Sequence, residues 1–170
     1  MAPHHRARVA RHVQCAIVTV SDTRTTADDR SGVVIRTALE GAGHSVAFGV
    51  IVPDEVDAIR SAVMGAAERK DVEAVIVTGG TGIAPRDLTI ESLQDVWSKE
   101  LPGFGEIFRA LSYDEIGPAA FLSRATAGII AATFVVILPG SPGACELALT
   151  RLLLPELAHI VDLLGKTVGS

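Results

Sequence analysis

Short apolar runs that alternate with helical stretches constrain this chain more than any other feature of its sequence. Three such runs are Val13–Val20, Val46–Val52 and Ala74–Thr78. The segments between them, Gly32–Leu39 and Asp54–Lys70, carry apolar residues at helical spacing. Strand, helix, strand, helix, strand is the order of a parallel sheet with helical crossovers. The pattern therefore predicts an α/β fold in which each crossover is right-handed.

The second half of the chain continues this pattern with longer helical segments. We expect helices over residues 90–97 and over Leu101–Ile116, although two glycines weaken the second of these. Phe134–Leu138 is a further buried strand, and a helix from Ala144 is expected to break or restart at Pro155.

The first eleven residues lack this periodicity. They contain Arg6, Arg8 and Arg11, but no apolar segment follows, so a secretory signal is not indicated. We expect a flexible arm over residues 1–11 and a single domain over residues 12–170. No apolar stretch reaches the roughly 20 residues that span a bilayer, so no membrane association is expected.

The composition of the chain limits the classes of molecule that it could bind. Apolar residues make up 48% of the chain and charged residues 21%, which is typical of a globular protein. The net charge of −5 disfavours nucleic acid, whose phosphates require a basic face. The two cysteines, Cys15 and Cys145, form no Cys-x-x-Cys motif and are expected to be free thiols in a reducing compartment, the cytoplasm.

Polar loops follow the predicted strands at the edge where ligands bind in open α/β sheets. These loops are Ser21–Ser31, Pro53-Asp54, Gly79–Thr89 and Pro139–Gly143. Because the carboxyl ends of parallel strands meet at one edge, we expect the four loops to converge on a common site.

The Gly79-Gly80-Thr81-Gly82 turn is the most informative of these segments. Glycines just after a strand allow backbone N–H groups to approach an anion closely. In the same loop Arg86 could pair with phosphate and Asp87 could hold a metal ion. The simpler alternative is a tight turn in which Asp87 or Thr89 caps the next helix.

Each of the other loops also has a simpler structural explanation. Asp54 would serve as a helix N-cap, the acidic Ser21–Ser31 loop would be solvated and end in a Ser31 cap, and Pro139–Gly143 would be a rigid turn. Carboxylates beside a phosphate-binding turn nevertheless suit Mg²⁺-dependent nucleotidyl transfer, because Mg²⁺ offsets the repulsion between two polyanions. No P-loop or Gly-x-Gly-x-x-Gly motif is present, so ATP would be bound without either.

Taken together, the motifs resemble the MoaB/Mog family of molybdenum-cofactor biosynthesis proteins. The matching segments occur in family order and cover nearly all of the chain after the arm. They are Thr19–Asp22, Asp29–Gly32, Val52–Glu55, Thr78–Thr89, Glu91, Pro102–Glu106, Leu122–Arg124 and Leu138–Pro142.

This resemblance implies a three-layer α/β/α fold with a mostly parallel sheet, assembled as a homotrimer or sometimes a hexamer. It implies Mg²⁺- and ATP-dependent adenylylation of molybdopterin, whose product passes to a molybdate-insertion enzyme. Asp54 and Asp87 would be the catalytic carboxylates and would hold Mg²⁺. The implied substrate contacts are Ser21, Asp29, Gly79, Gly80, Thr81, Gly82, Arg86, Thr89, Glu91, Ser123, Gly140 and Ser141.

Two departures from the family pattern leave an alternative open. Ile90 replaces a frequent proline, which should be a mild change at the start of a helix. Gly143 replaces a frequent lysine, which removes a cationic phosphate contact. The alternative to an adenylyltransferase is therefore a non-catalytic, oligomeric carrier of molybdopterin in the same pathway.

Overall fold

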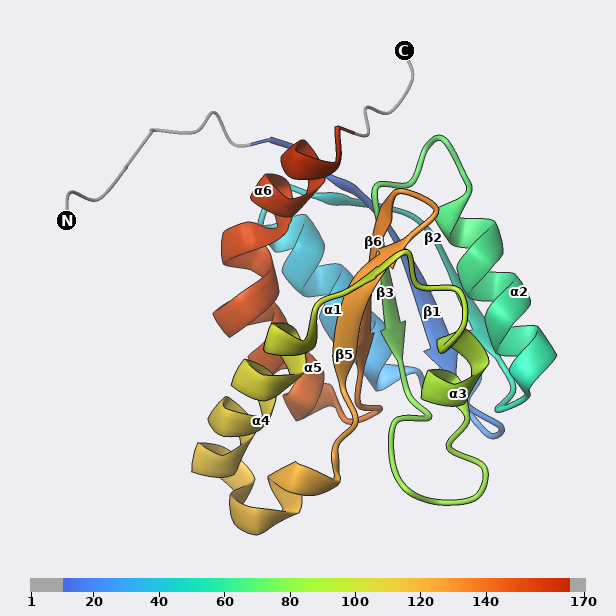
Figure 1. Cartoon of the computed structure of the whole chain (residues 1–170), viewed down its shortest axis with the longest axis vertical. Helices are drawn as coiled ribbons and strands as arrows, with labels where there is room; N and C mark the ends of the chain where they lie inside the picture. The colour runs from blue at the N-terminus through green and yellow to red at the C-terminus, as the bar shows by residue number, and fades with distance from the viewer. Residues whose placement is uncertain (1–10, 166–170) are drawn as a thin grey trace, which may run out of the picture.

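A mixed six-stranded sheet organises the computed structural model, which describes residues 11–165 (Figure 1). The strand order is β2-β1-β3-β6-β5-β4. The parallel strands are β1 (Gln14–Val20), β2 (Ser45–Val52), β3 (Ala74–Thr78) and β6 (Thr133–Leu138). The strand β5 (Thr126–Ile130) runs antiparallel to β6, and the short β4 (Lys99–Glu100) runs antiparallel to β5.

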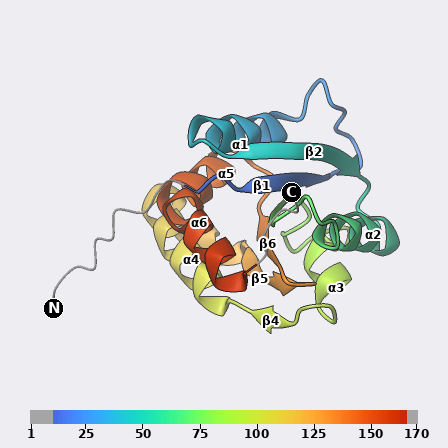
Figure 2. The ribbon, with the colours of Figure 1, turned by 90° about the horizontal axis from the view of Figure 1, so that it is seen from above.

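Helices cover both faces of the sheet, because the central strands are apolar on both sides. Figure 2 shows α4, α5 and α6 on one side, and α2 and α3 on the other. The first group packs with α1 against one set of alternating side chains of β1, including Cys15 and Ile17, while α2 packs against Ala16 and Val18. The helices are α1 (Arg30–Gly41), α2 (Val56–Ala67), α3 (Thr89–Leu93), α4 (Pro102–Ile116), α5 (Pro142–Ala148) and α6 (Leu154–Leu164). The expected three-layer α/β/α architecture is confirmed.

The sequence predicted a mostly parallel sheet but did not indicate the two antiparallel pairings, β4 with β5 and β5 with β6. The turn between β5 and β6 consists of Ala131 and Ala132, both in the left-handed backbone region with φ of 48° and 62°. Two-residue hairpins of this kind are normally signalled by Asn or Gly. Without those residues the hairpin leaves little trace in the sequence.

Several helix boundaries also differ from the sequence-based prediction. The helix α2 begins at Val56 rather than Asp54, and α3 ends at Leu93 instead of continuing towards Trp97. At the C-terminal end, a π-helical turn over Leu149–Leu153 separates α5 from α6. The helix restarts next to Pro155, as predicted, because proline provides no N–H for the preceding turn.

Ion pairs hold Arg11, the first described residue, against the rest of the domain. Arg11 forms ion pairs with Glu73, at 2.6 Å, and with Asp162 of α6. The rest of the expected flexible arm, residues 1–10, lies outside the described residues. Within residues 11–165, no helix is long and apolar enough to cross a membrane.

Both cysteines are free and buried, as expected. Burial raises the pKa of the Cys15 thiol to about 12, and it also raises the pKa of Cys145. Since the thiolate is the reactive form, both side chains act as small apolar core residues.

Candidate functional site

The four strand-end loops converge on one cleft with a volume of about 520 Å³. Figure 1 shows the long β3–α3 loop at the end of the sheet to which the arrows of β1 and β3 point. The end of the 3₁₀ segment Gly117–Leu122 forms a further wall of the cleft. The structure brings together ten of the residues singled out from the sequence: Ser21, Asp54, Gly79, Gly80, Thr81, Gly82, Asp87, Ser123, Gly140 and Ser141.

The turn after β3 closes only because it is built from glycines. Gly79 and Gly80 both have positive φ, at 101° and 65°. A Cβ on Gly79 would overlap the carbonyl oxygen of Val20, and one on Gly80 would overlap Thr89 Oγ1 and lie 2.8 Å from Asp54 Oδ1. The turn therefore brings the ends of β1 and β3 and the Asp54 loop into direct contact.

The turn also leaves hydrogen-bond donors available. Thr89 holds it from beneath, donating its hydroxyl to Gly79 O at 2.8 Å and its N–H to Gly80 O at 3.1 Å. Within the described chain, the N–H groups of Gly80, Thr81 and Gly82 form no hydrogen bond with protein. Adjacent, unpaired N–H groups of this kind form an anion-binding concavity. Thr89 itself is buried and lies outside the cleft lining, so it supports the turn.

Asp54 is not the helix cap that the simpler explanation requires. Glu55 occupies the N-cap position of α2, and no side chain caps that helix. Instead, Asp54 Oδ1 is buried and has no hydrogen-bond partner. The pKa of Asp54 is raised, first by this burial and then by repulsion from Asp22 and Asp87. An unpartnered buried carboxylate oxygen is costly, so the site favours a cation at this position.

Asp87 also fails to cap the helix that follows it. Leu88 occupies the N-cap of α3, while Asp87 Oδ2 accepts the N–H of Ala84 at 2.8 Å and closes the loop. A Cβ on Gly82 would lie 2.6 Å from that same oxygen, so the carboxylate packs directly against the glycine turn.

Arg86 does not line the cleft in this structure. Its Nε and Nη2 donate to the two carboxylate oxygens of Asp22 at 2.6 and 2.9 Å. Asp22 in turn accepts the N–H of Asp54 at 3.0 Å, and Arg86 lowers its pKa. Arg86, which the sequence predicted as a phosphate-binding residue, is thus an exposed side chain that links the loops after β1, β2 and β3.

Glu91 lies outside the cleft as well, in an ion pair with Arg124 that lowers the pKa of Glu91. Arg124 donates to the carbonyl oxygens of Gly82 and Asp87, each at 3.0 Å. The pair therefore fixes both ends of the segment that carries Asp87. The sequence offered no sign of this role for Arg124 beyond its position next to Ser123.

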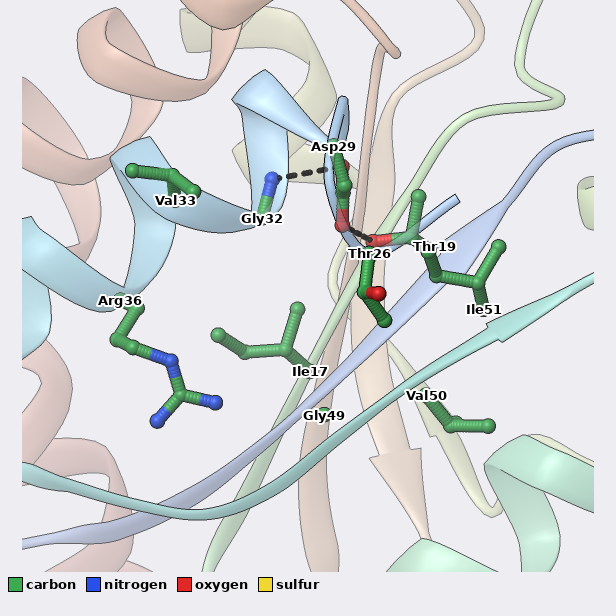
Figure 3. Close-up of a pocket in the computed structure, with 10 residues that line it drawn as sticks. All are labelled: Ile17, Thr19, Thr26, Asp29, Gly32, Val33, Arg36, Gly49, Val50 and Ile51. Carbon is green, nitrogen blue, oxygen red and sulfur yellow. Dashed lines mark hydrogen bonds between the residues drawn. The ribbon is translucent and has the colours of Figure 1, made fainter. Parts of the chain in front are cut away.

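Asp29 is the N-cap of α1, a role the sequence-based alternative gave to Ser31. It accepts the N–H of Gly32 at 3.0 Å and the hydroxyl of Thr19 at 2.7 Å, and it lines a separate pocket of about 240 Å³ between α1 and β2 (Figure 3). Ser31 is buried and donates its hydroxyl to Gly140 O at 2.8 Å.

Arg24 is a cleft residue that sequence reasoning missed. It is the one basic side chain among the described residues that line the cleft. In the sequence it is one charged residue of a polar loop, and only the folded path of that loop places it next to Gly140.

The carboxylates suit a metal ion that arrives with its substrate. Among residues 11–165, no group of three His, Cys, Asp or Glu side chains forms a ready-made metal cage. Mg²⁺ is commonly bound by one or two carboxylates together with substrate phosphates. Asp54, with its unpartnered oxygen, and Asp87, close enough to raise the pKa of Asp54, fit that mode of binding.

Comparison with known proteins shows the family to which the chain belongs. Residues 16–159 match the family described as a probable molybdopterin binding domain. The chain belongs to this molybdopterin-binding family. It is 52% identical over 158 residues to molybdenum cofactor biosynthesis protein B of Bacillus subtilis, covering 92% of this chain and 93% of that protein. The corresponding protein of Staphylococcus aureus strain Mu50 is 43% identical, with coverages of 98% and 100%.

Solved structures of the molybdopterin-binding family have the same fold. A crystal structure of a molybdenum cofactor biosynthesis protein B superposes with a TM-score of 0.90 at 45% identity, covering 94% of this chain and all of that one. The tungsten cofactor synthesizing protein MoaB of Pyrococcus furiosus gives 0.80 at 38% identity, with coverages of 89% and 96%. The resemblance inferred from the sequence motifs is confirmed.

The environment of Asp54 predicts a pH-dependent gain in stability for Asp54→Asn. Because the folded-state pKa lies above the ordinary 3.8, the contribution of Asp54 to wild-type stability is greatest in acid and declines as the pH rises through that folded-state pKa. The neutral amide avoids this decline. We expect Asp54→Asn to be more stable than wild type at pH 7 by up to about 1 kcal/mol, and the gain to shrink towards pH 4.

Denaturant unfolding between pH 4 and pH 8 measures this difference, with Asp57→Asn as the control. Asp57 is an exposed residue of the first turn of α2, so its replacement should cost a few tenths of a kcal/mol through the helix dipole. An Asp54→Asn variant less stable than wild type at pH 7 would contradict the proposed environment.

We expect different effects on stability from alanine at Gly80, in the glycine turn, and at Gly143, in α5. Gly80→Ala should lower the free energy of unfolding by at least about 1–2 kcal/mol, because of its positive φ and its overlap with Thr89. A Cβ on Gly143 meets no atom within 4 Å, so Gly143→Ala should change stability by less than about 0.5 kcal/mol or increase it. Equal effects in urea unfolding would contradict the packing described for the turn.

Proposed function

We propose that this chain acts in molybdenum cofactor biosynthesis and that its cleft transfers AMP from ATP to molybdopterin. In this reaction an oxygen of the pterin's terminal phosphate forms a bond to the α-phosphorus, while the bond from that phosphorus to pyrophosphate breaks. The observation that carries the proposal is the unpartnered carboxylate oxygen of Asp54 directly against a glycine turn with free N–H groups. One group favours a cation and the other an anion, a pairing that suits a metal-bound phosphate.

The chain's own residues can bind and orient the two substrates. The N–H groups of Gly80, Thr81 and Gly82 would hold a phosphate or another anionic oxygen, and Ser123 and Ser141 supply hydroxyl groups at the cleft wall. No general base is required, because a phosphate monoester is already mostly ionised at neutral pH. Asp54 and Asp87 would hold Mg²⁺, which supplies charge neutralisation for the phosphates and the leaving pyrophosphate.

Rigid support keeps these groups in place before substrate arrives. Thr89 fixes the glycine turn, the Glu91–Arg124 pair fixes the Asp87 segment, and the Asp22–Arg86 pair joins that segment to Asp54. Polar groups held in advance need not reorganise during the reaction, which is how electrostatic catalysis lowers a barrier.

We also propose that the chain forms a homotrimer, or a hexamer, in the cytoplasm. The adenylylated pterin would then pass to a molybdate-insertion enzyme. Six exposed apolar side chains on α4, directly before it and in the 3₁₀ segment after it support self-association, since exposed apolar surface can mark contact sites. They are Leu101, Ile107, Tyr113, Ile116, Phe121 and Leu122.

Incubation of the protein with molybdopterin, ATP and Mg²⁺ tests the reaction directly. Adenylylated pterin, detected by mass spectrometry, and pyrophosphate, measured with a pyrophosphate assay, should appear in equal amounts. Tight binding of molybdopterin without either product would favour a carrier instead of an enzyme.

The two aspartates provide the sharper test. Asp87→Asn should lower turnover with saturating substrates on the order of 10²–10³-fold and leave pterin binding largely intact, and Asp54→Asn should behave similarly. An amide keeps the shape of the side chain but loses the charge that holds Mg²⁺. Asp95→Asn is the matched control, because Asp95 is exposed and paired with Arg60 outside the cleft. Wild-type turnover in both cleft variants would remove these aspartates from the mechanism.

A further inference from the structure

We propose that Arg24 binds the triphosphate of ATP at the Gly140–Ser141 turn, and that Asp29 positions Arg24 for this role. The inference rests on the proposed use of ATP by this cleft. It assigns the nucleotide's phosphates to a residue of the β1–α1 loop, which supplies the positive charge that the turn after β6 lacks.

The guanidinium of Arg24 is fixed where two strand ends meet. Its Nη2 donates to Gly140 O at 2.8 Å, and Nη1 lies 3.4 Å from Ser31 Oγ. A Cβ on Gly140 would lie 3.4 Å from the Cα of Gly79 and 4.0 Å from Arg24 Nη2. The positive charge therefore sits beside both the glycine turn after β3 and the Gly140–Ser141 turn after β6.

Among residues 11–165, no other basic side chain lines this cleft. Arg86 is occupied by Asp22, and Arg124 by Glu91. Arg109 donates to the carbonyl oxygens of Ser123 and Ala125 from behind the wall. The turn over residues 139–143 contains no charged side chain. Without Arg24, a polyphosphate would face two carboxylates and no cation from the described chain.

Arg24 also retains donors for a ligand. Its two hydrogen bonds use only part of the donor set of a guanidinium, 30% of the side chain is exposed, and Arg24 lines the cleft. Arginine that is held on one edge and open on the other can bind phosphate oxygens with charge-assisted, bidentate hydrogen bonds.

Asp29 acts behind Arg24, not on the ligand. Its carboxylate is held by the hydroxyl of Thr19 and the N–H of Gly32, and its Oδ1 lies 3.9 Å from Arg24 Nη1. It does not line the cleft. This arrangement gives a physical role to a residue that the sequence motifs singled out but the cleft excludes.

Titration calorimetry of the intact protein with ATP and Mg²⁺ tests the assignment. Arg24→Gln should weaken ATP binding roughly 10- to 100-fold, the loss expected for a charge-assisted hydrogen-bond pair, and Arg24→Lys should recover part of that loss. The dependence of ATP affinity on salt concentration should become shallower in Arg24→Gln, because one ionic contact is gone. Asp29→Asn should raise the KM for ATP more than it lowers kcat. Arg36→Gln is the control and should bind ATP as wild type does, because Arg36 pairs with Glu40 on α1 and does not line the cleft.

The outcomes separate this inference from the proposed reaction. Wild-type ATP affinity in Arg24→Gln would overturn the inference, and so would a loss with unchanged salt dependence, which indicates only a structural role. ATP binding that depends on Arg24 but yields no adenylylated pterin would overturn the transfer reaction and leave the inference standing. Efficient transfer by Arg24→Gln with unchanged ATP affinity would overturn the role of Arg24 and leave the transfer reaction standing. Absence of ATP binding by the wild type would overturn both the role of Arg24 and the transfer reaction.

Discussion

The contact between the Gly79–Gly80 turn and its surroundings determines how the rest of the cleft is arranged. Because neither residue has a side chain, the turn rests against the carbonyl of Val20 on one side and against Thr89 and Asp54 on the other. This contact joins the carboxyl ends of β1 and β3 to the loop after β2. It also leaves consecutive backbone N–H groups without a protein partner among the described residues that line the cleft, where a phosphate can approach the main chain closely.

The same contact explains why the Asp54 carboxylate is energetically unfavourable in the folded protein. Its Oδ1 is enclosed by the turn and finds no donor, and its pKa rises as a result. Arg86 offsets this only in part, since its guanidinium is paired with Asp22, and Arg124 is paired with Glu91. A carboxylate kept unpaired among well-paired neighbours is typical of a site in which stability is sacrificed for ligand binding.

The sequence predicted the scaffold of the site better than the contacts within it. The parallel strands and the convergence of their loops follow from apolar periodicity and from the general rule for open α/β sheets. The hairpin of β5 and β6 was missed because Ala131 and Ala132 adopt left-handed conformations without the usual turn residues. The pairing of Arg86 with Asp22, and the position of Arg24, depend on how loops distant in sequence meet, which local pattern does not encode.

The central claim is that the free oxygen of Asp54 is a ligand for a divalent cation that arrives with ATP. A crystal structure of the protein with Mn²⁺ and a non-hydrolysable ATP analogue tests it most directly, because anomalous scattering locates the metal. The account predicts a metal peak about 2 Å from Asp54 Oδ1, bridged to phosphate oxygens above the Gly80–Gly82 turn. A bound nucleotide whose metal does not contact Asp54 would contradict it.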